Sequence, residues 1–251
     1  MNKLEIVKNS KLEDLTVVLD FDRTLTCGNV DGVEVASIIA VLREENYIDE
    51  DYVKEAKALF AHYRSLEIDP NLSRQEKSNL MQEWWQKHLN LLTVKGFTKN
   101  DVDKVVLSKL LKLRHGVKDF LQILNARGIK TIILSSGIPG YDGILGILQR
   151  EGCDYPNIEI ISNKITWNES GVASGYVEPV IHSIDKTGFL TADKLSKNIL
   201  LVGDNLHDAE MVLDALDRTV FRVGIYEGKD LSNLEHYKKA FDMVMVNEKI
   251  D

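Results

Sequence analysis

The 251-residue chain is poor in cysteine and proline, with two and four of these residues. Cys27 and Cys153 stand far apart in the sequence, and such a pair suits neither a disulfide framework nor a zinc site. A reducing interior is therefore the simpler environment. Because prolines are so few, and internal repeats and low-complexity segments are absent, we expect compact, regular structure.

Long apolar runs and basic clusters are also missing. No segment approaches the length of a membrane span, and Met1–Glu5 has no apolar stretch of the signal-peptide type. The formal net charge is -8, and no long lysine or arginine run offsets it. These features argue against a nucleic-acid or membrane partner and favour a cytoplasmic protein that acts on a small molecule. They leave the oligomeric state open.

What the chain does have is enough apolar sequence for a full core. Hydrophobic residues make up 44% of it and charged residues 28%, which suits one large domain or two unequal ones. Short apolar runs that alternate with helical patterns predict a parallel sheet covered by helices on both faces. The predicted strands are Thr16–Leu19, Thr131–Leu134, Ile158–Ile161, Ile199–Val202, Val220–Val223 and Met243–Val246.

The segment between the first two strands has a different pattern. Its apolar residues recur at helical spacing, and Ser73 with Glu76 forms a capping-box sequence before one of the helices. The predicted helices are Val33–Glu44, Asp51–Ser65, Arg74–Leu92 and Asp101–Leu111.

This pattern predicts an α/β core interrupted by a helical insertion. We assign residues 1–28 and 112–251 to the core and residues 29–111 to the insertion. Ligands of open α/β sheets bind at the carboxyl ends of the strands, and the insertion begins at such an end. We therefore expect it to cover the ligand site as a cap.

The first strand ends in two acids, Asp20 and Asp22. Alternate side chains of a strand point to the same side, so the two carboxylates are expected to emerge together. At that spacing they repel each other, and a divalent cation or a shared proton would compensate them. The alternative is an ordinary strand end at which Asp begins a turn or caps a helix.

Polar residues follow two further strands. Ser135, Ser136 and Gly137 come before a predicted helix near Tyr141, so a hydroxyl and backbone N–H groups could form an anion site there. A serine cap on an ordinary turn is the alternative. Asp204 follows a later strand and would coordinate a cation.

Two more residues complete the candidate set. Asp208 enters the helix predicted after Asp204, where it would orient a second shell around the cation or a lysine, or simply cap the helix. Lys186 precedes another predicted helix, and its assignment as the cation for a phosphate rests almost wholly on the family resemblance described next. A solvated surface position is the alternative for this lysine.

These residues occur along the chain in an order that resembles the four motifs of the haloacid dehalogenase superfamily. The first motif holds Asp20 and Asp22, the second the serines, the third Lys186, and the fourth Asp204 and Asp208. Within that superfamily, the segments Leu66–Pro70 and Met81–His88 are similar to the cytosolic 5'-nucleotidase III group, the pyrimidine 5'-nucleotidases. The resemblance covers nearly the whole chain. It implies a Rossmann-like α/β core with a parallel sheet plus an inserted helical cap domain.

The resemblance also implies an enzyme, a Mg²⁺-dependent 5'-nucleotidase that converts nucleoside 5'-monophosphates to nucleoside and phosphate. Asp20 would be the nucleophile that forms an aspartyl-phosphate, and Asp22 would be the general acid and then the base. The metal ligands would be Asp20, the backbone carbonyl of Asp22, and Asp204. The groups that bind the phosphoryl oxygens would be Ser135, Ser136 and Lys186, with Asp208 in support.

Substrate choice falls to the insertion. By the same resemblance, Glu67 would bind the edge of the base and Trp85 would line the nucleoside pocket, although aromatic residues at helical spacing, including Tyr63 and Trp84, usually build a core. A Trp at position 85 is similar to members that accept 7-methylguanosine monophosphate, because a cationic base stacks well on indole. UMP, CMP and 7-methylguanosine monophosphate are thus all candidate substrates.

Two other functions stay open. One is a phosphatase for a non-nucleotide metabolite such as phosphoserine, built on the same core. The other is a catalytically silent scaffold, which is disfavoured because several charges in one cleft destabilise a fold unless a ligand compensates them.

Overall fold

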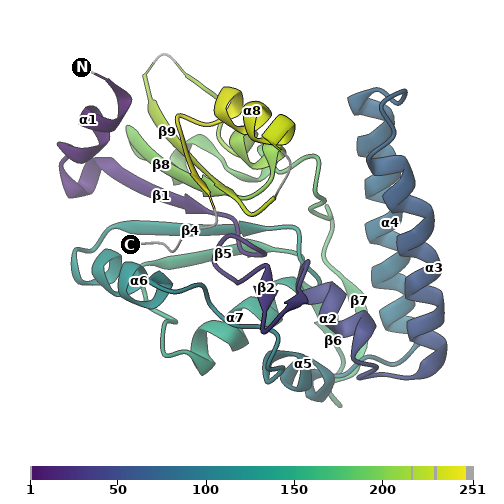
Figure 1. The fold of residues 1–251 in the computed structure, drawn as a ribbon. Helices are drawn as coiled ribbons and strands as arrows, with labels where there is room; N and C mark the ends of the chain where they lie inside the picture. Colours follow the sequence, from purple (N-terminus) through teal and green to yellow (C-terminus); the bar gives the residue numbers. More distant parts are fainter. Residues whose placement is uncertain (1, 216, 229–230, 247–251) are drawn as a thin grey trace.

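The computed structural model describes residues 2–215, 217–228 and 231–246 (Figure 1). Its centre is a six-stranded parallel sheet in the order β10-β9-β8-β1-β4-β5. These strands are β1 (Leu15–Leu19), β4 (Lys130–Ser135), β5 (Ile158–Ser162), β8 (Asn198–Gly203), β9 (Thr219–Tyr226) and β10 (Met243–Val246). All six predicted strands are confirmed, and β9 is longer than expected.

Both faces of the sheet are buried. Along β1, Val17 and Leu19 pack into one hydrophobic cluster and Val18 packs into another, as the two-residue period of a strand requires. Helices α6 and α7 lie on one side of the sheet in Figure 1 and α8 lies on the other. The covering elements are α1 (Lys3–Lys8), α6 (Val117–Ala126), α7 (Gly140–Arg150), α8 (Leu231–Ala240) and the 3-10 helix η4 (Leu206–Glu210).

The strand register brings the predicted site residues to one edge. Leu19, the last residue of β1, lies beside Ile133 of β4 and Val202 of β8. The Asp20 N–H then donates to the Val202 carbonyl at 3.0 Å, so pairing continues into the first acid. The segments that follow β1, β4 and β8 therefore leave the sheet next to one another.

Four helices form within residues 29–111, as predicted. They are α2 (Ile38–Glu44), α3 (Glu50–Glu67), α4 (Arg74–Val94) and α5 (Lys99–Val106). Helices α3 and α4 form a long pair that stands beside the sheet in Figure 1. The capping box of Ser73 and Glu76 is confirmed at the start of α4. Within the described ranges, no helix is both long and apolar enough to cross a bilayer.

The first of these helices was predicted to start too early. Its expected first turn is instead β3 (Val33–Glu34), which pairs with β2 (Asn29–Val30) across the two-residue turn Asp31-Gly32. Both turn residues have positive φ, 53° and 88°, and Asp-Gly is the sequence that such hairpins favour. The helix begins at Ile38, after the N-cap Ser37.

The last of these helices ends at Val106 and not at Leu111. The Arg150 guanidinium donates to the carbonyls of Val106 and Leu111, and it thereby satisfies the Val106 carbonyl, which a longer helix would bond internally. An unpredicted hairpin, β6 (Ile165–Trp167) with β7 (Ala173–Tyr176), packs against α4.

The two helices expected beside the site are short 3-10 segments. Lys186 precedes η2 (Thr187–Phe189), and Asp208 lies in η4. Arg222 explains the short η4, because its guanidinium donates to the carbonyls of Ala209 and Val212 at 2.7 and 2.9 Å. The remaining 3-10 segments are η1 (Leu12–Asp14) and η3 (Ala192–Lys194).

Candidate active site

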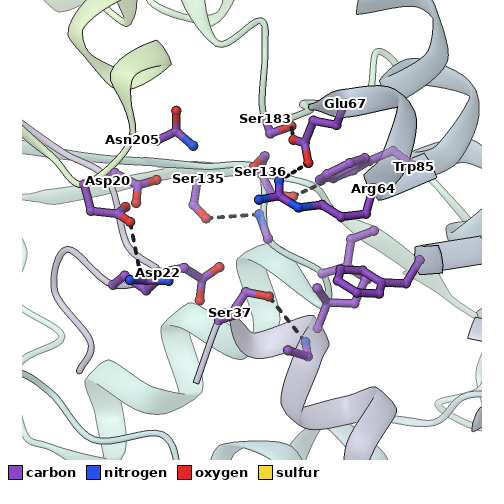
Figure 2. A pocket seen from close by; sticks show the side chains of 18 of the residues that line it. Asp20, Asp22, Ser37, Arg64, Glu67, Trp85, Ser135, Ser136, Ser183 and Asn205 are labelled. Atoms are coloured by element: carbon purple, nitrogen blue, oxygen red, sulfur yellow. Dashed lines mark hydrogen bonds and ion pairs between the residues drawn. The ribbon is translucent and has the colours of Figure 1, made fainter. Parts of the chain in front are cut away.

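A cavity of about 410 Å³ lies where the carboxyl edge of the sheet meets helices α2, α3 and α4. Figure 2 shows Asp20 and Asp22 on one side, Glu67 and Trp85 on the other, and the serines between them. Every residue that the sequence singled out for the site lines this cavity: Asp20, Asp22, Glu67, Trp85, Ser135, Ser136, Lys186, Asp204 and Asp208.

Lys186 is the cation that links the acids. Its buried Nζ donates to Asp20 Oδ1 at 2.5 Å and to Asp208 Oδ1 at 2.8 Å. Burial disfavours the ammonium charge, but the two carboxylates outweigh burial and raise the pKa of Lys186. This lysine is therefore a buried positive charge and not a solvated surface residue.

The acids around Lys186 are only partly compensated. Burial, together with Asp208 and against the opposing effect of Lys186, raises the pKa of Asp20 to about 6. Burial, Asp20 and Asp208 raise the pKa of Asp204 well above its usual value. The Thr24 hydroxyl lies 3.2 Å from Asp20 Oδ2 and 3.3 Å from Asp204 Oδ1, where it can donate to either. Ionising all of these acids together is therefore unfavourable without a further cation.

A hard divalent cation fits this donor set. Within the part of the chain that the structure describes, Asp20, Asp204 and Asp208 bring carboxylate oxygens within 4.8 Å of one another. Carboxylate oxygen is the ligand that Mg²⁺ prefers, and its double charge would offset the repulsion. Arg23 compensates less of the acids' charge than such a cation would. Its Nε lies 3.6 Å from Asp204 Oδ2, is buried, and has no hydrogen-bond partner.

Asp22 lies next to this cluster, with its two oxygens in different surroundings. Oδ1 accepts a hydrogen bond from the Ile38 N–H at 2.9 Å. A Cβ on Gly137 would lie 3.3 Å from Oδ2 and 3.2 Å from Ser135 Oγ, so glycine leaves that space open. Burial, followed by the charge of Asp20, raises the pKa of Asp22 to about 7.

The turn after β4 is held rigidly. Ser135 is buried, and its Oγ accepts a hydrogen bond from the Gly137 N–H at 3.0 Å. The Asn163 side-chain amide donates to the carbonyls of Ser136 and Ile181 at 3.0 and 2.9 Å, and its Oδ1 accepts from the Ile181 N–H at 2.8 Å. One amide thus joins this turn to the segment that leads to Lys186.

The turn after β8 fixes Asp208. A Cβ on Gly203 would lie 2.3 Å from the Cβ of Asp208, so only glycine permits this approach. Asp208 Oδ2 accepts from the Asn205 N–H at 2.9 Å, while Oδ1 faces Lys186. Asp208 is consequently both a cap of η4 and a partner of the lysine, which were the alternatives that the sequence left open.

The helical side of the cavity is formed by α3 and α4. Trp85 Nε1 donates to the Ser136 carbonyl at 2.7 Å, and Glu67 Oε1 accepts from Ser183 Oγ at 2.7 Å. Arg64 pairs with the other oxygen of Glu67 (Figure 2). Tyr63 and Trp84 stack with ring centroids 5.8 Å apart in a core cluster against which Trp85 packs.

Sequence reasoning missed several supporting groups. Arg114 is buried, donates to the carbonyls of Arg23 and Thr24, and pairs with Glu227 at 2.8 Å. It holds the loop after β1 at the point where the chain leaves the sheet. Arg114 lies about 90 positions after that loop, so no local pattern predicts the contact. The Ile38 N–H carries no sequence signal at all.

Comparison with known proteins identifies the chain. The model of the family "Pyrimidine 5'-nucleotidase (UMPH-1)" matches residues 23–250. The chain belongs to this family. As a member of the pyrimidine 5'-nucleotidase family it is an enzyme, a 5'-nucleotidase, which confirms the resemblance that its motifs indicated.

Relatives of this family member match it along most of their length. The 7-methylguanosine phosphate-specific 5'-nucleotidase of Gallus gallus is 28% identical over 99% of this chain and 88% of that protein. The Homo sapiens protein of the same name is 31% identical over 92% of this chain and 79% of its own length. A crystal structure of cytosolic 5'-nucleotidase IIIB bound to cytidine has a TM-score of 0.86 and 25% identity, and the match covers 98% of this chain and 85% of that one. The predicted haloacid dehalogenase fold is thereby confirmed.

Proposed function

We propose that this 5'-nucleotidase hydrolyses UMP, CMP or 7-methylguanosine monophosphate, with Mg²⁺ as cofactor, through a phosphorylated Asp20. The observation that carries the proposal is one cavity that holds both the Asp20–Lys186 pair, at 2.5 Å, and the side chains of Glu67 and Trp85. It is supported by relatives specific for 7-methylguanosine phosphate and by a cytidine-bound structural neighbour.

The metal would be held by carboxylates already in place. Asp20, Asp204 and the backbone carbonyl of Asp22 are the proposed ligands. When bound, Mg²⁺ would neutralise charge on these carboxylates and on the phosphoryl oxygens. The unfavourable ionisation of these acids together supports a requirement for such a cation.

In the first half of the proposed reaction, an Asp20 oxygen forms a bond to phosphorus while the bond from phosphorus to the nucleoside 5'-oxygen breaks. Asp22 gives its proton to that departing oxygen. Lys186 has three N–H donors, and two of them face Asp20 and Asp208, so the third remains for a phosphoryl oxygen. Ser135 and Ser136 bind the other phosphoryl oxygens.

The second half returns the enzyme to its starting state. Asp22, now a carboxylate, takes a proton from water as the water oxygen attacks phosphorus. The bond between phosphorus and Asp20 breaks, and inorganic phosphate leaves. A nucleoside admitted in place of water would accept the phosphoryl group, so some phosphotransfer is expected.

Residues 29–111 are proposed to act as a cap on the core of residues 1–28 and 112–251. The bonds from Trp85 to Ser136 and from Ser183 to Glu67 join the two parts at the cavity, and they support a cap that keeps water away. Glu67 would accept from the base, and Trp85 would stack on it.

Phosphate release from a substrate panel tests this proposal. The panel contains UMP, CMP, AMP, GMP, 7-methylguanosine monophosphate, phosphoserine and p-nitrophenyl phosphate, each with Mg²⁺ and with excess EDTA. We expect the pyrimidine or methylguanosine nucleotides to be preferred and EDTA to abolish turnover. A preference for phosphoserine would instead establish the metabolite phosphatase, and full activity in EDTA would remove the metal from the account.

A further inference from the structure

The two oxygens of Asp22 differ in what holds them. Oδ1 accepts from the backbone N–H of Ile38, at 2.9 Å, across a sequence separation of 16 residues. Ile38 is the first residue of α2, and the first N–H groups of a helix have no partner within it. Asp22 therefore takes up a donor that the helix itself leaves free.

The other oxygen faces the turn after β4. The position of a Cβ on Gly137 would be 3.3 Å from Asp22 Oδ2 and 3.2 Å from Ser135 Oγ, so these two oxygens flank the same small space. That space belongs to the turn to which the proposed function assigns the phosphoryl group. Oδ2 is thus the Asp22 oxygen that faces the turn assigned to the phosphoryl group.

We propose that the Ile38 N–H is a positioning group, which holds the Asp22 carboxyl group so that Oδ2 carries and delivers the proton. An oxygen that accepts an N–H bond is the less favourable place for a carboxyl proton, so the proton resides on Oδ2. This inference rests on the proposed function, in which Asp22 is the general acid.

The start of α2 is fixed against the core. Ser37, in extended conformation (φ -174°, ψ 170°), accepts from the Ala40 N–H through its side chain. The Ile38 side chain is fully buried, and a Cβ on Gly143 of α7 would lie 3.6 Å from its Cδ1. The Ile38 N–H therefore reaches Asp22 when α2 packs on α7. Asp22 has this hydrogen bond only when the insertion is in this position.

The chemical step defines a selective test. As the bond from Asp20 to phosphorus forms and the bond to the 5'-oxygen breaks, the electron pair on that oxygen takes the Oδ2 proton. A nucleoside alkoxide is strongly basic and needs this proton. The p-nitrophenolate ion is weakly basic and leaves without it.

The experiment replaces Ile38 with proline. Ile38→Pro removes the N–H, and proline is favoured at the first position of a helix, after a residue in extended conformation. Ile38→Val is the matched control, since it keeps the N–H and loses one methylene. Both variants are assayed with Mg²⁺ on CMP and on p-nitrophenyl phosphate. Relative to Ile38→Val, we expect Ile38→Pro to lose about tenfold in kcat/KM on CMP and less than about twofold on p-nitrophenyl phosphate. The value of kcat/KM covers only the steps up to release of the leaving group, so the second half, in which Asp22 serves both substrates as a base, does not enter it.

Equal losses on the two substrates, or no loss on CMP, would overturn the inference. Asp22→Asn separates it from the proposed function: if that variant loses kcat/KM equally on both substrates, the acid role of Asp22 fails first. Because the proline Cδ would lie where the Ile38 hydrogen points, against Asp22 Oδ1, the α-hydroxy acid analogue of isoleucine is also introduced at position 38 by nonsense suppression. It keeps the side chain and replaces the N–H with oxygen, and the same substrate ratio decides.

Discussion

The two sides of the cavity are built in different ways. On the sheet side, the acids and serines lie at the ends of parallel strands, and Lys186 joins them from the segment before η2. The central pair, Asp20 and Lys186, is only 4% and 6% exposed. The helical side presents Glu67 and Trp85, which are only partly buried, from α3 and α4. Charge is thus placed where the backbone is most constrained, and the groups proposed to select the base stand on a separate helix pair.

The partners also differ. On the sheet side Lys186 pairs with Asp20 across 166 positions, so the pair exists only in the folded chain. On the helical side the charged partner of Glu67 is Arg64, one turn earlier, a contact that an isolated helix can form; the distant partner of Glu67 is the uncharged Ser183 hydroxyl. If this contrast reflects function, changes on the sheet side should affect every phosphate ester, and changes on the helical side should affect only nucleotides.

The largest effect is expected from Asp20→Asn. Loss of the proposed nucleophile should lower kcat at least about 10³-fold on both CMP and p-nitrophenyl phosphate. Because the change removes one of several repelling carboxylates, the fold should survive, as circular dichroism and a thermal melt would show. Activity within tenfold of the wild type on either ester would refute the nucleophile.

Lys186→Met should come next. It removes the cation that neutralises Asp20 and Asp208, so we expect kcat to fall about 10²- to 10³-fold on both esters and urea to unfold the protein more easily. Lys197→Met is the matched control, since Lys197 is exposed. A loss confined to nucleotides would contradict the division between the two sides.

Glu67→Ala tests the helical side and should lower activity on nucleotides only. We expect a loss of about 10- to 100-fold in kcat/KM for CMP and less than about twofold for p-nitrophenyl phosphate, because only the nucleotide has a base to bind. Glu83→Ala on α4 is the control, since Glu83 is exposed and pairs with Lys87 on the surface. Equal losses on both esters would mean that Glu67 supports the fold and not base recognition.

The smallest effect at neutral pH concerns His88 on α4. Unlike Lys186, this buried side chain pairs with no carboxylate among the residues that the structure describes. Burial, with Arg43 nearby, lowers the pKa of His88 to about 3, and the Tyr52 hydroxyl lies 3.0 Å from its Nε2. The unfolded chain binds the proton near pH 6.5, so His88 favours folding above that pH and loses this contribution as pH falls towards about 3. His88→Gln should flatten the fall in urea stability between pH 7 and 4. An unchanged slope would show that other groups cause it.

The sheet side was largely predictable from the sequence. Nearly continuous apolar runs marked the six strands, and parallel pairing places their carboxyl ends at one edge, so Asp20, Ser135 and Asp204 had to lie near one another. Glycine suits positions 137 and 203 because side chains of the site lie close to the backbone at both positions.

What escaped prediction depends on distant backbone groups. The carbonyls that Arg150 and Arg222 intercept set the ends of α5 and η4, and no local spacing records such contacts. The Ile38 N–H reaches Asp22 because Asp31-Gly32 makes a hairpin that delays α2, and the helical pattern of the following residues hid that turn. Glu67 and Trp85 came from resemblance, since periodicity alone does not separate a cavity wall from a core.

The most direct test of the account is a rapid acid quench of the enzyme during turnover of CMP with Mg²⁺, followed by mass spectrometry of its peptides. The account predicts one phosphoryl group on the peptide that contains Asp20, and none in Asp20→Asn. Release of phosphate with no phosphoryl group on Asp20 at any time point, together with inversion of configuration at phosphorus, would show that water attacks the nucleotide directly, and would contradict the mechanism.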